Sequence, residues 1–235
     1  MGGEFTPPKI TIGMPCGSGS LPWATMMSLL NTVRACDKEG VGIQIESIVG
    51  CSVVQWARSI VADKFLKSDS THLFWIDSDI VWRVEDFFRL VGFGAVLDVV
   101  GAAYPMKRER GGFLINLAGD LGKVEINGLG CVKIRSMGLG FTIMKRAVVE
   151  KIAATKEKVI DQANGVEYAD IFRVDRTHGG PRGEDVAFFD DIRDAGYDVW
   201  LDPSIRLGHI GTKMYRSDVI DALGLQEYAQ EAESQ

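Results

Sequence analysis

Two aspartates separated by one residue follow a short apolar run in the stretch FWIDSDIV, residues 74–81. Like charges this close repel, so Asp77 and Asp79 need a cation or hydrogen-bond donors between them. Carboxylate oxygens suit hard divalent ions such as Mg²⁺ and Mn²⁺, which also bind phosphate oxygens. The alternative is a turn without metal, in which Asp79 caps the chain and Asp77 accepts backbone hydrogen bonds. The pair therefore predicts either a metal–phosphate site or a capped turn.

Three other segments carry residue types that bind ligands or transfer protons. Glu184 and Asp185, in GPRGEDVAFF, begin a predicted helix, where acidic residues also favour the helix dipole without any further role. Their functional interpretation is a general base or a substrate-binding acid. His209 lies between glycines in GHIG, and is either an ordinary polar residue or a third metal ligand. Arg58 borders an apolar helical stripe, and forms either a structural ion pair or a guanidinium that orients Asp77 or a nucleotide phosphate.

Alternating strands and helices over the first hundred residues must position these groups. Strands are predicted at 9–16, 41–50, 72–76 and 98–106, and helices at 22–37, 53–68 and 84–92. This alternation predicts an α/β fold with a mostly parallel sheet and helices on both faces. Ligands bind at the carboxyl ends of the strands in such sheets. Asp77 and Asp79 directly follow the 72–76 strand, so we expect them at that edge.

The second half has a different character. Residues after 107 are glycine-rich and β-like, with a hairpin signal at Asn127–Gly128. Helices are predicted near 146–155 and 184–196, and an extended segment at 197–211. We expect one domain over 9–215, with a nucleotide-binding half (9–106) and a β-rich acceptor and catalytic half (107–215). Residues 1–8 are expected to be a vector-derived remnant, and residues 216–235 a helical acidic tail.

Composition is typical of a globular protein without a strongly basic surface. The chain has 235 residues, a net charge of -6 and a pI near 5.2, which does not favour nucleic acid or an anionic membrane as the main partner. Its four cysteines show no CxxC spacing, which indicates a reducing compartment. No apolar run reaches membrane-spanning length and no signal-peptide core is present. We expect a cytoplasmic protein.

An ordered series of short motifs spans residues 9–211. It consists of MPC (14–16), QWARS (55–59), FWIDSD (74–79), GLGFTIMKR (138–146), GED (183–185) and GHIG (208–211). This series resembles the glycosyltransferases of the GT-A fold, in particular DxD-containing enzymes similar to family 2. The resemblance implies a Rossmann-like, mostly parallel sheet flanked by helices, with a β-rich acceptor-side second half.

The resemblance also implies a reaction and roles for individual residues. The reaction would be metal-dependent transfer of a hexosyl or pentosyl group from a UDP- or GDP-sugar to an acceptor hydroxyl, with Mn²⁺ or Mg²⁺ as cofactor. Asp185 would be the base of an inverting reaction, with Glu184 beside it, and Asp79 the most direct metal ligand. The remaining implied contacts are Asp77 and His209 at the metal, and Pro15, Cys16, Arg58, Asp77, Ser78, Gly138 and Gly140 at the donor. Ser59 departs from the family pattern, which has asparagine after the arginine.

Several other functions remain open. DSDIV also fits the nucleophile motif of haloacid-dehalogenase-like phosphatases, although that aspartate normally follows the first strand and here two strands precede it. A sugar nucleotidyltransferase or a non-catalytic sugar-nucleotide-binding module would use the same fold. A dinucleotide oxidoreductase is disfavoured because Pro22 stands where GxGxxG needs its third glycine. The acceptor would be a glycan, a lipid-linked sugar or, less favoured, a nucleic acid, and basic loops at 104–110 and 173–182 are expected near the mouth of the site.

Overall fold

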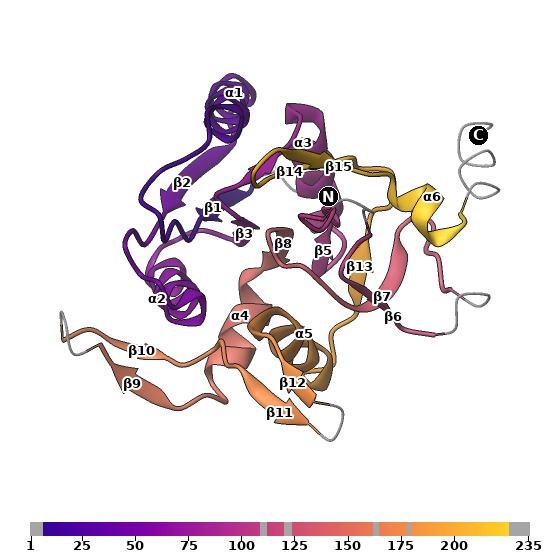
Figure 1. Cartoon of the computed structure of the whole chain (residues 1–235). Helices are drawn as coiled ribbons and strands as arrows, with labels where there is room; N and C mark the ends of the chain where they lie inside the picture. The colour runs from indigo at the N-terminus through magenta and orange to yellow at the C-terminus, as the bar shows by residue number, and fades with distance from the viewer. Residues whose placement is uncertain (1–6, 109–111, 120–123, 162–164, 178–179, 226–235) are drawn as a thin grey trace, which may run out of the picture.

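The computed structural model describes residues 7–108, 112–119, 124–161, 165–177 and 180–225 (Figure 1). An eight-stranded sheet lies at its centre, in the order β2-β1-β3-β8-β5-β13-β7-β6. The bounds of these strands are β1 (Lys9–Gly13), β2 (Gly42–Glu46), β3 (His72–Ile76), β5 (Val99–Gly101), β6 (Ile115–Leu117), β7 (Val132–Met137), β8 (Phe141–Lys145) and β13 (Val199–Leu201).

Most strands of this sheet run in one direction. β1 pairs in parallel with both β2 and β3, and β5 pairs in parallel with β13. β8 lies between β3 and β5 and is antiparallel to both, while β7 is antiparallel to β13 and β6. The predicted α/β class with a mostly parallel sheet is confirmed. The antiparallel insertion of β8 places its first residues beside the carboxyl ends of β3 and β5.

Helices cover both faces of the sheet (Figure 1). α1 (Trp23–Glu39) and α3 (Val84–Gly94) pack on one face, and α2 (Val54–Lys67), α4 (Arg146–Ala153) and α5 (Glu184–Asp194) on the other. The side chains of β3 alternate between the two resulting cores: Leu73 and Trp75 join one, Phe74 and Ile76 the other. Burying an apolar side chain of this size stabilises the fold by about 1.5–3 kcal/mol. A strand covered on both faces therefore explains the unbroken apolar run before Asp77.

Short strands and hairpins surround this sheet in the second half of the chain. β9 (Lys158–Ile160) pairs with β10 (Glu167–Ala169), and β11 (Asp175–Thr177) with β12 (Gly180–Arg182). β14 (Gly208–Ile210) lies between β15 (Met214–Arg216) and β4 (Ile80–Val81), so it is held next to the segment after Asp79. The two hairpins project from the lower side of the molecule in Figure 1, and β14–β15 crosses above the sheet.

Some predicted elements differ in extent. The strands predicted at 9–16, 41–50 and 98–106 are shorter, and the extended 197–211 segment divides into β13 and β14. The turn at Asn127 is longer than a two-residue hairpin, because its side chain accepts hydrogen bonds from the amides of Leu129 and Cys131, 3.0 Å each. α6 (Val219–Leu223) begins the predicted tail, whereas residues 1–6 of the predicted remnant and 226–235 lie outside the described residues.

Two general expectations can be compared with the described residues. All four cysteines are free thiols, as expected for a chain without a disulfide framework. Within the described ranges, the helices are too short or too polar to cross a lipid bilayer.

Candidate active site

The predicted site residues gather at the carboxyl edge of the sheet. Pro15 follows β1, Asp77 follows β3 and Tyr104 follows β5, while the early turns of α2 and α5 supply Arg58 and Asp185. These side chains border a cavity of about 300 Å³. The predicted residues that line it are Pro15, Arg58, Asp77, Ser78, Asp79, Glu184, Asp185 and His209. The fold therefore brings together predicted residues from five separate parts of the chain.

Arg58 joins two of the predicted acidic residues. Its guanidinium donates to Asp77 Oδ1 at 2.9 Å and forms a second ion pair with Asp185. Only 3% of the Arg58 side chain is exposed. Burial disfavours its charge, but Asp185 and Asp77 outweigh that cost and hold the pKa of Arg58 above its ordinary value. One interpretation of the sequence was that Arg58 orients Asp77, and Arg58 does contact Asp77. The sequence did not indicate that Arg58 also contacts Asp185.

Tyr104 completes the surroundings of Asp77. Its hydroxyl donates to Asp77 Oδ2 at 3.1 Å and accepts from the amide of Gly140 at 3.3 Å. Burial, together with the charges of Asp77 and Asp185, raises the pKa of Tyr104 well above its ordinary value, so the hydroxyl keeps its proton. The sequence analysis missed Tyr104 as a site residue. Its place near the carboxyl end of the strand predicted at 98–106 was the signal that could have identified it.

Close packing explains the two glycines before β8. A Cβ atom on Gly140 would lie 2.2 Å from Asp77 Oδ2, and one on Gly138 would lie 2.5 Å from the Tyr104 hydroxyl. Gly140 also accepts a hydrogen bond from the amide of Asp77 at 3.0 Å. The resemblance placed these glycines against the donor sugar. In the structure, Gly140 makes room for the Asp77 carboxylate, and Gly138 for Tyr104.

Asp79 faces a histidine and a lysine. Its Oδ1 lies 3.4 Å from His209 Nε2, and its Oδ2 accepts a hydrogen bond from Lys107. His209 Nδ1 lies 2.7 Å from the carbonyl oxygen of Pro105, which can only accept, so Nδ1 carries the proton. Nε2 faces Asp79 Oδ1, to which it donates a hydrogen bond when the ring is protonated and presents a lone pair when the ring is neutral. Two facing acceptors need a proton or a cation between them.

The pKa of Asp79 shows that its surroundings favour the anion. Burial alone would raise this pKa, but hydrogen bonds and charges from His209 and Lys107 outweigh burial and lower the pKa below its ordinary value. Asp79 is therefore a carboxylate at neutral pH. A carboxylate that faces an imidazole nitrogen is a suitable pair of ligands for a divalent cation.

The predicted three-ligand set of Asp77, Asp79 and His209 does not converge. Among the described residues, no group of three His, Cys, Asp or Glu side chains is arranged to hold a metal. The reason is that both carboxylate oxygens of Asp77 are engaged, one with Arg58 and one with Tyr104. Mg²⁺ is commonly held by one or two carboxylates together with substrate phosphates and water. Asp79 and His209 fit such a partly substrate-held cation.

Asp185 is an acidic residue of the site whose side chain is only 16% exposed. It lies in the first turn of α5 and accepts from the amide of Leu139 at 3.3 Å. Burial, with smaller contributions from the charges of Asp77 and Glu184, outweighs the opposing charge of Arg58 and raises the pKa of Asp185 to about 6. Asp185 also borders a second cavity of about 250 Å³, together with Met106, Leu114 and Gly138. It therefore lies on a wall that the two cavities share.

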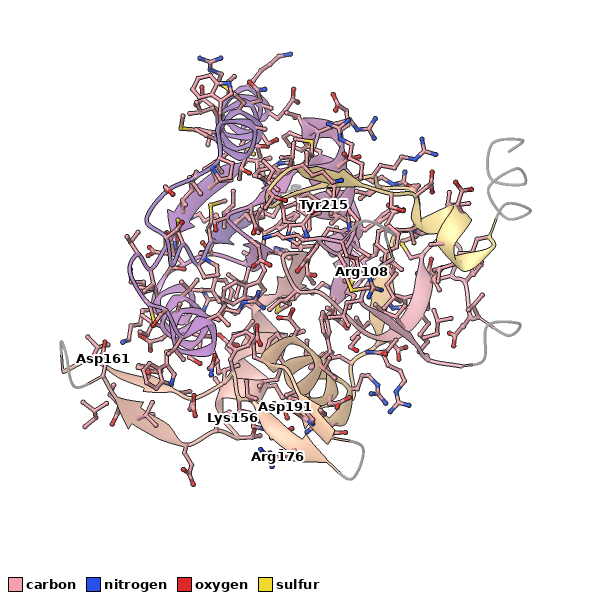
Figure 2. The ribbon with its side chains drawn as sticks, viewed as in Figure 1. Arg108, Lys156, Asp161, Arg176, Asp191 and Tyr215 are labelled. Atoms are coloured by element: carbon pink, nitrogen blue, oxygen red, sulfur yellow. The ribbon has the colours of Figure 1, made fainter. Side chains whose placement is uncertain are left out.

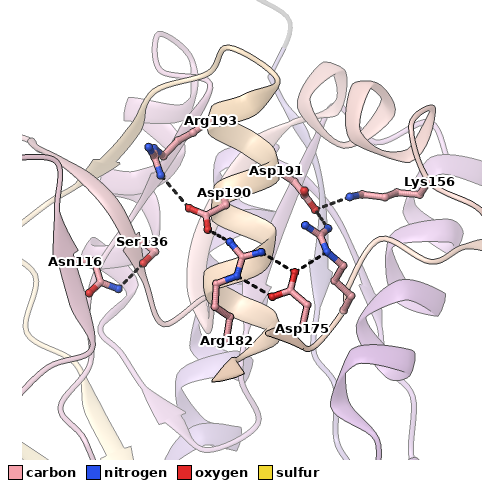
Figure 3. A network of polar contacts seen from close by, with 9 residues as sticks. Asn116, Ser136, Lys156, Asp175, Arg182, Asp190, Asp191 and Arg193 are labelled. Atoms are coloured by element: carbon pink, nitrogen blue, oxygen red, sulfur yellow. Dashed lines mark hydrogen bonds and ion pairs between the residues drawn. The ribbon is translucent and has the colours of Figure 1, made fainter. Parts of the chain in front are cut away.

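A network of ion pairs ties the β11–β12 hairpin to the helix that carries Asp185 (Figure 3). Arg182 donates to both oxygens of Asp175, at 2.6 and 2.7 Å, and also pairs with Asp190 on α5. Arg173 pairs with Asp175 and with Asp191. Lys156 pairs with Asp191 at 2.6 Å, as Figure 3 shows, and Figure 2 labels both residues near α5. The network anchors the chain on both sides of Gly183, immediately before Glu184 and Asp185.

Not every predicted residue reaches the site. Cys16 is buried, donates to the Ser20 carbonyl at 3.4 Å, and is not among the residues that line the first cavity. Ser59 accepts from the amide of Phe172 at 3.2 Å inside the core. Two larger hollows, of about 770 and 760 Å³, lie beside α4 and beside β6. Neither contains any of the predicted site residues, so the smaller cavities at the sheet edge are the better candidate site.

Comparison with known proteins shows a likeness of fold. The crystal structure of A197 from STIV is 22% identical in sequence, with a TM-score of 0.54 over 86% of each chain. The crystal structure of GalNAc-T7 with UDP, GalNAc and Mn²⁺ is 12% identical, with a TM-score of 0.53 over 89% of this chain and 44% of GalNAc-T7. This chain thus spans under half of GalNAc-T7. No protein-family model matches the sequence, and no curated protein matches it.

Proposed function

We propose that this protein is a divalent-metal-dependent glycosyltransferase that moves a sugar from a nucleoside-diphosphate sugar to an acceptor hydroxyl. The observation that carries the proposal is the position of Asp185, a partly buried carboxylate with a pKa of about 6 on the wall between two cavities. One cavity contains the anionic pair Asp77 and Asp79 with His209. The other is lined by Met106, Leu114 and Gly138 together with Tyr104, Lys107 and His209, and has room for an acceptor beside Asp185.

The donor occupies the first cavity in this proposal. Asp79 and His209 hold Mn²⁺ or Mg²⁺, which as a Lewis acid neutralises charge on the diphosphate. Pro15, at the end of β1, and Ser78 border the space left for the nucleoside. The fold shared with GalNAc-T7 supports this assignment, because that structure contains a nucleotide, a sugar and Mn²⁺. Asp77 acts through Arg58 and Tyr104 as an anchor for the site.

Asp185 acts as the base. The acceptor oxygen attacks the anomeric carbon while the bond from that carbon to the phosphate oxygen breaks, and the diphosphate leaves with the electron pair. The acceptor proton passes to Asp185, which Arg58 and the Leu139 amide hold in a fixed orientation. A base with a pKa near 6 is deprotonated at neutral pH and still basic enough to accept this proton. Attack from the side opposite the leaving group inverts the anomeric configuration.

A phosphatase of the haloacid-dehalogenase type fits the geometry less well. Its nucleophile would be Asp77, which accepts hydrogen bonds from Arg58 and Tyr104 and, unlike Asp185, does not border the second cavity. Asp77 also follows the third strand of the chain instead of the first. A nucleotidyltransferase and a non-catalytic binding module use the same donor contacts, and reaction products separate them from the proposed enzyme.

Thermal unfolding in the presence of UDP-sugars and GDP-sugars, with and without Mn²⁺, tests the proposal. We expect a rise in Tm that requires both the nucleotide sugar and the cation. Incubation with acceptors should then release UDP or GDP. Release of pyrophosphate in a separate incubation with a nucleoside triphosphate and a sugar 1-phosphate would identify a nucleotidyltransferase, and binding without release from any acceptor class would identify a binding module. Retention of the anomeric configuration would contradict the assignment of Asp185 as the base.

A further inference from the structure

The ammonium group of Lys107 lies against the carboxylate of Asp79, which the proposed function assigns to the metal. Its ammonium donates to Asp79 Oδ2, while the other oxygen of Asp79 faces His209. The pair is partly open to solvent, with 39% of the Lys107 side chain and 30% of the Asp79 side chain exposed. Lys107 therefore neutralises Asp79 without closing the site to an incoming ion.

One short segment after β5 contacts all three predicted metal residues. Tyr104 donates to Asp77, the Pro105 carbonyl accepts from His209, and Lys107 donates to Asp79. A bridge between Pro105 and Phe113 and a 2.8 Å hydrogen bond from the Met106 amide to Gly112 hold this segment. Figure 2 labels Arg108, the next residue along the chain. These backbone contacts hold the segment that carries Lys107 next to Asp79.

The aliphatic part of the Lys107 side chain packs against a glycine. It passes Gly211, in the turn between β14 and β15, where an added Cβ would lie 3.1 Å from Lys107 Cδ. The amide of Ile210 donates to the Asp79 carbonyl at 2.8 Å, so this turn is fixed next to Asp79. The second glycine of GHIG therefore leaves space for the aliphatic part of Lys107.

We propose that Lys107 is an internal counter-ion that competes with the divalent cation for Asp79 and, once displaced, binds the diphosphate of the donor. This inference rests on the proposed function. An ammonium group and a divalent cation repel each other, so each weakens the binding of the other to the same carboxylate. Lysine has a flexible stem and three donors, which suit it to move from a carboxylate to a phosphate. Lys107 would then weaken binding of the metal alone and strengthen binding of the metal together with the nucleotide.

Substitution of Lys107 by glutamine tests both parts of the proposal. The affinity for Mn²⁺ alone should rise, and the affinity for the nucleotide in the presence of Mn²⁺ should fall. Titration calorimetry with Mn²⁺ alone should show about two- to fivefold tighter binding to Lys107→Gln than to the wild type, the factor expected on removing a partly exposed ion pair. Titration with UDP and GDP in saturating Mn²⁺ should show about tenfold weaker binding, because a charge-assisted hydrogen bond to phosphate is lost. Lys107→Arg, which keeps the charge, should remain closer to the wild type in both titrations.

Lys64 provides a matched control. It pairs with Glu46 at 3.1 Å, with side-chain exposures of 42% and 27% that resemble those of Lys107 and Asp79, and neither residue lines the candidate site. Lys64→Gln should leave both affinities unchanged. Mn²⁺ binding by Lys107→Gln that is equal to or weaker than wild type would overturn the competition, and unchanged nucleotide affinity would overturn the contact with diphosphate.

The same titrations separate this inference from the proposed function. Wild-type protein that binds neither Mn²⁺ nor a nucleoside diphosphate would refute both. Wild-type protein that binds both, with no response to Lys107→Gln, would refute the role of Lys107 alone. Nucleotide binding that depends on Lys107 and needs no cation would also refute the competition, since Lys107 would then serve in place of a metal.

Discussion

Gly140 lies so close to Asp77 that a Cβ atom on Gly140 would come within 2.2 Å of Asp77 Oδ2. This contact follows from the antiparallel pairing of β3 and β8, which sets Gly140 opposite the first residue after β3. The position of Asp77, and through Arg58 that of Asp185, therefore depends on the absence of a side chain at Gly140, directly before β8.

Gly140→Ala should displace the Asp77 carboxylate from Arg58 and Tyr104. We expect at least tenfold weaker binding of UDP or GDP in the presence of Mn²⁺, roughly the loss that follows from disturbing groups around a metal site. Titration calorimetry measures this loss. Gly128→Ala is the control, because an added Cβ at Gly128 meets nothing within 4 Å. Equal binding by both variants would show that the close contact has no functional consequence.

Asp79→Asn and His209→Gln should abolish Mn²⁺ binding, because each removes one of the two proposed ligands. Asp77→Asn should weaken Mn²⁺ binding by about 10- to 100-fold without abolishing it, since Asp77 acts from outside the ligand set. Electron paramagnetic resonance of free Mn²⁺ distinguishes these cases. Loss of Mn²⁺ binding in all three variants to the same extent would favour the three-ligand set that the sequence predicted.

The pKa of Asp185 sets the pH range of activity. A base with a pKa of about 6 is protonated below pH 6, so kcat/KM should fall about tenfold per pH unit below that value and level off above it. An ordinary aspartate, with a pKa of 3.8, would keep the protein active two units lower. Asp185→Asn should lower kcat by about 10²- to 10⁴-fold.

Asp194→Asn is the control for the effect of Asp185, since Asp194 is an exposed residue at the end of the same helix. Its pH profile and kcat should match those of the wild type. An acid limb near pH 4 in the wild-type protein would show that Asp185 is not the titrating base.

The ion-pair network of Figure 3 should stabilise the protein in a salt-dependent way. Arg182→Met removes the bidentate pair with Asp175 and the pair with Asp190. We expect a loss of about 1–2 kcal/mol in the free energy of unfolding at low salt, from charge-assisted hydrogen bonds that are only partly exposed. Urea titrations at 0.05 and 1 M NaCl measure it, and the difference should shrink at high salt.

Lys67→Met provides the comparison for Arg182. It removes one exposed pair, with Asp63 at 2.7 Å and four residues away on α2, and should cost no more than about 0.5 kcal/mol. A loss for Arg182→Met that equals that for Lys67→Met would show that the hairpin network adds nothing beyond single surface pairs.

Local sequence patterns predicted the elements and the edge at which the site lies. The apolar run 72–76 became a strand buried on both faces, and Asp77 and Asp79 follow it at the carboxyl edge of the sheet. The helices that begin near Arg58 and Asp185 were also predicted nearly in full. These features follow from the periodicity and composition of short segments, which a sequence displays directly.

Only the tertiary structure decided which charged groups meet. Arg58 pairs with a carboxylate 127 positions away, and Lys107 with one 28 positions away. Both contacts depend on β8 entering the sheet antiparallel between β3 and β5, which turns the segment after β5 toward Asp77, Asp79 and His209. Strand order arises from long-range packing of both cores, and that packing leaves no local pattern in the sequence. The same packing occupies both oxygens of Asp77 and leaves Asp79 facing His209.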